Sequence, residues 1–284
     1  MKKIYKNILI FFVFGMLCLS GLFAESIPKL GSSGKLEGNI AVVTMFIDDA
    51  RTSWNFDKKK DLEIYDYAYY DLEIACDWIT KVCKDYGRKV NFIWDWDKNP
   101  ELCYSGAKIY IDATNEDEDI YSEIQYIIRN YIDSDKIKKS LGANGIIYLA
   151  CFNTSSKNRI TSMTDAWERE RPLNEEICYM FMQCEKYIEG PGQFAHEMLH
   201  TFGAADLYAP GMYGITQDFV DYMESSRNND IMGFWCGTDP NTYSYVYDKV
   251  PNTLTDITAY YIGLTNSSKT VQKWGFKPSD YVSK

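Results

Sequence analysis

The sequence predicts an α+β fold in which helices cover a mixed, twisted sheet. Short apolar runs at residues 39–47 and 145–152 have the length and β-branched composition of buried strands. Between them, residues 57–86 repeat apolar side chains every three or four positions, which is the period of an amphipathic helix. After Gly203 the chain is punctuated by glycine, proline and asparagine, so we expect a smaller, irregular lobe there.

The first expected elements alternate between strand and helix. Residues 39–47 form a strand that two aspartates follow, and the helix over 57–86 ends where Gly87 can adopt a left-handed cap. Residues 90–96 and 108–113 are the next expected strands. Strands that alternate with helices favour a sheet with helices packed on it.

The second half of the N-terminal lobe continues this alternation. A helix is expected over residues 117–140, with Thr114 as its N-cap and Gly142 after its last turn. The apolar runs 145–152 and 177–183 are the last expected strands.

Two more helices are expected, over residues 192–201 and 255–264. The chain has no internal repeat and no low-complexity linker, so residues 25–284 should form a single domain. Its N-terminal lobe should span about residues 38–203 and its C-terminal lobe about residues 204–284.

Residues 1–24 have the pattern of a secretory signal peptide. Three lysines precede an apolar run at 8–23, and Ala24 stands before polar sequence. An uncleaved anchor is the alternative, but the run is short for a membrane span. We therefore expect cleavage after Ala24, export to the periplasm or the medium, and no stable membrane insertion afterwards.

The net charge of the chain bears on its partners. The chain carries 40 acidic and 30 basic side chains, a formal charge of −10. Such a surface repels phosphate backbones, so we expect no nucleic-acid partner.

Seven cysteines follow the signal segment, and an odd number leaves at least one thiol outside intramolecular disulfides. Cys76 and Cys83 should lie about 10 Å apart along one helix, too far to bridge.

The only two histidines of the chain, His196 and His200, lie in the segment AHEMLHTFGAADLY. On a helix this spacing puts both imidazoles on one face, where they can bind one metal ion. Glu197 lies one step round the helix, placed to reach a water on the metal. Gly203 can end the helix in a left-handed turn, and Asp206 follows on a chain turned back toward the histidines. Such strings also occur in helices without metal, but the glycine and the aspartate favour a metal site.

These residues, HExxHxxGxxD, resemble the extended zinc signature of the metzincin metallopeptidases, with aspartate where most members have a third histidine. Snapalysin-type secreted bacterial enzymes are similar in using aspartate there. Metzincins also carry a methionine in a tight turn beneath the metal. Residues 229–233, NDIMG, look like that turn, with Met232 as the matching residue. The resemblance implies a metzincin-like fold, with the active-site helix in the larger N-terminal lobe.

The resemblance implies a secreted zinc endopeptidase that acts on proteins or peptides. The two histidines and Asp206 would bind one Zn²⁺, and Glu197 would be the general base. Gly203 and Met232 would shape the site. Substrate would lie along an exposed sheet edge, which we expect near residues 159–164. One departure is Phe234, which stands where several metzincin groups have a tyrosine, so the role of that hydroxyl is vacant or supplied elsewhere.

Three alternatives stay open. Glu224 would be the third ligand if the site were thermolysin-like, with a glutamate from a second helix. Calcium would suit the acidic residues at 48–49, 95–97 and 116–119, although none has EF-hand spacing. The chain would be a non-catalytic secreted binding or adhesin-like protein on a peptidase-derived fold if its 23 tyrosines served as a contact surface.

Overall fold

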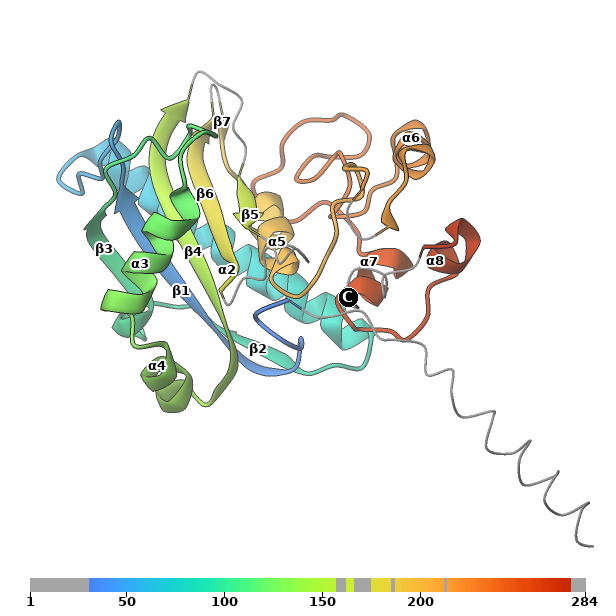
Figure 1. The fold of residues 1–284 in the computed structure, drawn as a ribbon, viewed down its shortest axis with the longest axis horizontal. Helices are drawn as coiled ribbons and strands as arrows, with labels where there is room; N and C mark the ends of the chain where they lie inside the picture. Colours follow the sequence, from blue (N-terminus) through green and yellow to red (C-terminus); the bar gives the residue numbers. More distant parts are fainter. Residues whose placement is uncertain (1–30, 157–161, 166–174, 185–186, 212–213, 277–284) are drawn as a thin grey trace, which may run out of the picture.

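A seven-stranded mixed sheet forms the centre of the molecule in the computed structural model (Figure 1). Its strands are β1 (Gly38–Asp48), β2 (Val90–Ile93), β3 (Cys103–Lys108), β4 (Ala143–Ser156), β5 (Met163–Asp165), β6 (Ile177–Cys184) and β7 (Tyr187–Ile188). The structure describes residues 31–156, 162–165, 175–184, 187–211 and 214–276. The expected signal peptide and its cleavage site lie outside these residues.

The strand order is β2-β1-β4-β6-β5, with β3 also paired to β1 and β7 to β6. β1 runs parallel to β2, β3 and β4, and β4 runs parallel to β6. β5 and β7 are antiparallel to β6, which makes the sheet mixed, as predicted.

Helices pack on both faces of this sheet. The helices of the described chain are α2 (Lys59–Asp85), α3 (Ile120–Tyr131), α4 (Ser134–Leu141), α5 (Pro191–His200), α6 (Gln217–Ser225), α7 (Asp256–Tyr261) and α8 (Lys269–Trp274). α3 and α4 lie on one face and α2 on the other, while α6, α7 and α8 gather beyond α5 (Figure 1). Among the described residues, no helix has the length and apolarity needed to cross a bilayer.

The central strands explain the continuous apolar runs of the sequence. Every residue of β1 from Ile40 to Ile47 is at most 1% exposed, and the middle of β4 (147–152) and most of β6 (177–182) are at most 4% exposed. A strand that is covered on both faces has no polar side, so it reads as an unbroken apolar run. The strands predicted at 39–47, 145–152 and 177–183 are confirmed.

α2 confirms the long helix predicted over residues 57–86. The side chains at its apolar positions are buried, including Ile64, Ala68 and Leu72. Gly87 follows with φ +72°, and its amide donates to the Lys84 carbonyl at 2.9 Å, as a left-handed cap requires. α2 packs against α5, and α5 confirms the helix predicted at 192–201.

The strand predicted at residues 108–113 is wrong, because β3 ends at Lys108. Ser105 lies opposite Phe46 and Ala107 opposite Ile47, so Gly106 is an extra residue in the strand. Its φ of +80° forms a bulge that any residue with a Cβ would strain. The serine and glycine therefore continue the strand instead of ending it. The strand predicted at 90–96 is also shorter, since β2 covers only 90–93.

The single helix predicted over residues 117–140 is in fact two helices, α3 and α4. The chain is extended at Ile132, which ends α3 and is buried. The Asp133 carboxylate then caps α4 by accepting a hydrogen bond from the Lys136 amide at 3.0 Å. Gly142 follows α4 with φ +59°, as predicted for the end of the longer helix.

Thr114 is not a helix cap, which corrects a second prediction in this region. The Asp119 carboxylate caps α3 by accepting from the Ser122 amide at 3.1 Å. Thr114 instead donates its hydroxyl to Asp112 at 2.7 Å and accepts from Arg51 at 3.1 Å. It therefore fastens the loop before α3 to the loop that follows β1.

The region after Gly203 contains more regular structure than predicted. α7 lies within the helix predicted at 255–264, but α6 and α8 were not expected. Both begin at a hydroxyl cap. The Thr216 and Ser268 side chains each accept a hydrogen bond from the amide three residues later, at 3.3 and 3.1 Å.

The six cysteines whose side chains the structure describes are all free. Cys76 and Cys83 lie buried on α2 and do not bridge, as expected. Burial raises the pKa of Cys83 to about 12, so this thiol stays protonated and unreactive at neutral pH.

Asp71 on α2 and Glu189 beside α5 are buried carboxyl groups. Burial, followed by the nearby Glu189 charge, raises the pKa of Asp71 to about 8. Burial likewise raises the pKa of Glu189 to about 7. Asp71 Oδ2 has no hydrogen-bond partner in the described structure. The folded chain therefore binds protons here that the unfolded chain has released, and folding stability falls as the pH rises.

We expect the stability that this pair contributes to be present at pH 4 and to be lost as the pH rises through about 7 to 8. Asp71→Asn removes one ionisation and should raise the unfolding midpoint at pH 8 by roughly 5 °C, with a much smaller effect at pH 5. Thermal unfolding at both pH values measures this. Glu73→Gln, an exposed change on the same helix, is the control. Equal shifts at both pH values would contradict the prediction.

Candidate metal centre

α5 is held tightly at its first turn. Pro191 begins it with a fixed φ, and the Gly190 amide donates to the Gln193 side chain at 3.3 Å. A Cβ on Gly192 would come within 2.5 Å of the Gly237 backbone, so only glycine permits this approach. The start of α5 is thereby packed against the chain that follows Met232.

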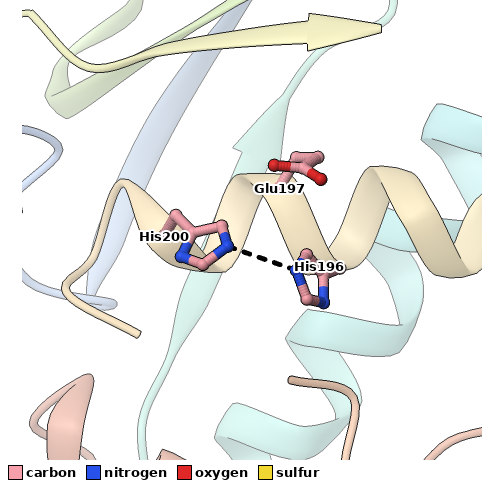
Figure 2. Close-up of side chains that lie close together, drawn as sticks. All are labelled: His196, Glu197 and His200. Carbon is pink, nitrogen blue, oxygen red and sulfur yellow. Dashed lines mark hydrogen bonds between the residues drawn. The ribbon is translucent and has the colours of Figure 1, made fainter. Parts of the chain in front are cut away.

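The two imidazoles lie on the same side of α5, one turn apart (Figure 2). His196 Nδ1 lies 2.8 Å from the Ile231 carbonyl oxygen, and His200 Nδ1 lies 3.0 Å from that of Ala204. A carbonyl only accepts, so each Nδ1 carries a proton and donates. In a neutral imidazole this leaves the lone pair on Nε2. The two Nε2 atoms are 3.2 Å apart.

Asp206 completes this arrangement. The Gly203 amide donates to the His200 carbonyl at 2.8 Å, and Gly203 has φ +99°, so the chain turns back after α5. Asp206 Oδ1 then lies 3.1 Å from His196 Nε2 and 3.3 Å from His200 Nε2. Three potential ligand atoms thus face one point from a helix and from the turn that follows it.

These separations fit a tetrahedral zinc ion. Ligands that lie about 2.0–2.1 Å from such an ion are about 3.3 Å from one another. Within the described part of the chain, Asp206 Oδ1 is also a buried atom without a hydrogen-bond partner, which is costly unless a positive charge faces it. The residues present therefore suit a divalent cation with nitrogen and oxygen ligands.

The electrostatics of the cluster also favour a positive charge. Burial lowers the pKa of His200, but the Asp206 carboxylate outweighs burial and raises it overall. The two imidazoles in turn outweigh burial at Asp206 and hold its pKa well below the usual range. A bound proton or a metal ion would supply the positive charge that the Asp206 carboxylate favours. A metal ion would do so while both histidines stay neutral.

Glu197 is 4% exposed and lies within 4.8 Å of the histidine nitrogens, measured between potential ligand atoms. Its Oε2 accepts a hydrogen bond from the Thr164 hydroxyl of β5 at 2.7 Å. Burial raises its pKa, although both imidazoles oppose this. Among the described residues, Glu197 and the two histidines are the group found to have metal-binding geometry. Thr164 was expected only as part of a sheet edge, and its bond to Glu197 could not be predicted because the two residues are 33 positions apart.

The segment 229–233 forms a tight turn in which the Gly233 amide donates to the Asp230 carbonyl at 2.9 Å. Met232 is fully buried, and its carbonyl accepts from the Leu207 amide at 2.9 Å. The carbonyl of Ile231 is the partner of His196. The turn is therefore bonded both to the histidine and to the segment that carries Asp206.

Asp230 holds this turn in place. Its buried carboxylate accepts hydrogen bonds from the Met232 amide at 2.8 Å, the Thr255 amide at 2.7 Å and the Thr258 hydroxyl at 2.8 Å. Asp230 orients the Ile231 carbonyl through the turn. This role of Asp230 could not be predicted from the sequence, because its partners Thr255 and Thr258 lie at the start of α7 and within it.

Two aromatic residues border the site. Tyr208 is 40% exposed, and its ring is stacked on His196. Phe234 is 58% exposed and meets Tyr208 edge-on. Glu224, the alternative third ligand, is exposed on α6, whereas Asp206 lies beside both imidazoles.

Two of the acidic residues considered for calcium, Asp49 and Asp95, have protein partners. Asp49 is buried, and its carboxylate accepts from the Thr52 amide at 2.6 Å and the Ala113 amide at 3.1 Å. Asp95 pairs with Lys98 at 2.5 Å. Asp49 is thus a loop anchor.

Comparison with protein families and with curated proteins finds no match to this chain. The case for a function therefore depends on the geometry of the site.

Proposed function

We propose that this chain is a zinc-dependent endopeptidase of the metzincin type. One observation supports it above the others. His196 Nε2, His200 Nε2 and Asp206 Oδ1 converge with separations of 3.1–3.3 Å beside the buried carboxylate of Glu197. Three ligands with a free fourth position and an adjacent base are the arrangement of a hydrolytic zinc site.

In this proposal His196, His200 and Asp206 bind the ion. When bound, the ion supplies Lewis acidity to the attacking water and to the substrate carbonyl. Glu197 takes the proton of the attacking water and passes it to the leaving amine. Its raised pKa brings this base closer to neutral pH, where it can both accept and return a proton.

The substrate would lie along β5. β5 is the last strand in the order of the sheet, so a peptide can extend the sheet there through main-chain hydrogen bonds. Thr164 of this strand donates to Glu197, which links the edge directly to the base. The edge predicted at residues 159–164 overlaps β5 at Met163 and Thr164, and residues 159–161 lie outside the described structure.

The N-terminal pattern supports export, so the proposed enzyme would act in the periplasm or the medium on proteins or peptides. The alternative is a non-catalytic binding protein. The tyrosines with exposed rings on α2 and α3 favour it, among them Tyr67, Tyr70 and Tyr126 at 47–61% exposure. A buried base beside a metal-binding group argues for catalysis.

Metal analysis of the purified protein, with a casein digestion assay alongside, tests the proposal. We expect one zinc ion per chain and proteolysis that a strong chelator abolishes and added zinc restores. If the purified chain contains no zinc, takes none up and leaves casein intact, the endopeptidase proposal is excluded. The non-catalytic binding protein is then the remaining proposal.

Thr164→Val should lower kcat/KM about tenfold or more, because the isosteric change removes the hydrogen bond that orients Glu197. Thr164→Ser keeps the hydroxyl and should stay close to wild type. Steady-state kinetics on a peptide substrate, with zinc content measured in parallel, checks this. Equal rates for the valine and serine variants would show that the hydroxyl does not position the base.

A further inference from the structure

The C-terminal end of α5 takes a hydrogen bond from a distant part of the chain. The last carbonyl groups of a helix have no partner within the helix, so they need donors from elsewhere. Thr201 caps α5 at this end and is fully buried. Its carbonyl accepts a hydrogen bond from the Ser33 amide at 3.0 Å. A residue from before β1 thereby holds the end of the helix that carries both histidines.

Ser33 belongs to a tight turn over residues 31–34, called the N-terminal turn below. The Gly34 amide donates to the Gly31 carbonyl at 3.0 Å, and Gly34 has φ +77°. A Cβ on Gly31 would lie 2.2 Å from the Thr201 carbonyl oxygen, so only glycine permits this approach. The turn is therefore packed directly against the end of α5.

Hydrogen bonds to the sheet keep the N-terminal turn in this place. The Ser32 amide donates to the carboxylate of Glu176, just before β6, and the Glu176 amide donates to the Ser32 hydroxyl at 3.0 Å. The Ser33 hydroxyl donates to the Ile146 carbonyl of β4 at 2.8 Å. Glu176 and Ser33 are at most 2% exposed, and hydrogen bonds in such buried surroundings are stronger than in water.

The segment that begins at Thr201 determines the position of two proposed ligands. His200 Nδ1 lies 3.0 Å from the Ala204 carbonyl oxygen, so this segment orients the His200 ring. Asp206 follows two residues after Ala204, and the course of the same segment brings it to the imidazoles. The carbonyl that holds the other imidazole lies in a different turn, so it cannot replace this support.

We propose that Ser33 is a positioning residue for the metal centre. Its amide fixes the Thr201 carbonyl, and with it the start of the segment 201–204. That segment in turn holds His200 and leads to Asp206. Partners outside the ligand set raise metal affinity because they keep the ligands in the geometry of the complex. This inference rests on the proposed function, since it assumes that His200 and Asp206 bind the ion.

Gly31→Ala tests this role, because the added methyl group would push the N-terminal turn away from Thr201. We expect a zinc affinity about tenfold lower than wild type or weaker still, measured by competition with a chromophoric chelator. The visible spectrum of the cobalt-substituted protein should change as well, since the ligands are less well placed.

Gly87→Ala is the control for lost stability alone. It strains the backbone at φ +72°, and no atom of the described chain beyond its neighbours lies within 4 Å of the added Cβ. It should melt below wild type and keep the zinc affinity and the cobalt spectrum. If Gly31→Ala does not fold, Ser32→Ala takes its place, because it removes only the hydroxyl that accepts from Glu176. Its zinc affinity should fall about threefold, the effect of one hydrogen bond.

The outcomes separate this inference from the proposed function. A wild-type chain that binds no metal overturns both. If the wild type binds zinc and the variant of the N-terminal turn equals it in affinity and cobalt spectrum, the role of Ser33 alone is overturned. Equal losses of affinity in Gly31→Ala and Gly87→Ala would also overturn it, because the loss would then follow from stability and not from the contact with Thr201.

Discussion

Glu197→Gln should lower kcat/KM by about three orders of magnitude while the protein still binds one zinc ion. The amide has nearly the same shape as the carboxylate and can keep the hydrogen bond from Thr164, but it cannot accept a proton from water. Because Glu197 is only 4% exposed, a carboxylate dissolved in the buffer cannot easily reach the site and act as the base in its place. Casein digestion and peptide kinetics, each with zinc analysis of the same sample, measure the two effects separately.

Glu123→Gln is the matched control, since it makes the same change at an exposed position of α3. It should leave both activity and zinc content unchanged. If Glu197→Gln digests casein at the wild-type rate, Glu197 is not the base. If wild type and Glu197→Gln both bind zinc and neither digests casein, the chain has a metal site without peptidase activity. That result would favour the non-catalytic binding protein.

The site residues that could be predicted from the sequence are those close together along the chain. His196, Glu197 and His200 lie within one and a half turns of a helix, and Gly203 and Asp206 follow within one tight turn. Helical periodicity and the conformational freedom of glycine are local properties, so spacing alone predicted that these side chains would be neighbours. In the structure Asp206 lies beside both imidazoles, as this spacing predicted.

Residues that act across the fold could not be predicted in this way. Thr164 reaches Glu197 because β5 pairs with β6 in an antiparallel register, and a three-residue strand has too little pattern to be recognised. Asp230 gives no local signal either, because its role depends on contacts with Thr255 and Thr258. Only the tertiary structure shows which side chains hold the ligands in place.

The errors in the fold have a similar cause. The strand expected at 108–113 in fact lies at 103–108, and it includes Gly106 in a bulge that only pairing with β1 creates. The division between α3 and α4 is marked locally by Asp133, a good N-cap that the apolar pattern across residues 117–140 obscured. In the second case the sequence does carry a local signal, but the helical periodicity across it predicts one continuous helix.

Asp206→Ala should abolish tight zinc binding, whereas Glu224→Ala should leave it intact. Asp206 Oδ1 is 3.1 and 3.3 Å from the two imidazole nitrogens, while Glu224 is exposed on α6. Loss of a ligand should cost more than the roughly 10–100-fold in affinity typical of changes outside the ligand set.

Thermal unfolding gives a readout of this prediction that does not depend on activity. An ion bound at about a thousand times its Kd stabilises the folded state by about 4 kcal/mol, or roughly 10 °C for a domain of this size. Zinc should therefore raise the midpoint of the wild type and of Glu224→Ala by this amount and leave Asp206→Ala almost unchanged. The reverse pattern would assign the third ligand to Glu224. Equal increases in all three proteins would mean that zinc binds without either carboxylate, because a ligand can stabilise only through contacts that it makes in the folded state.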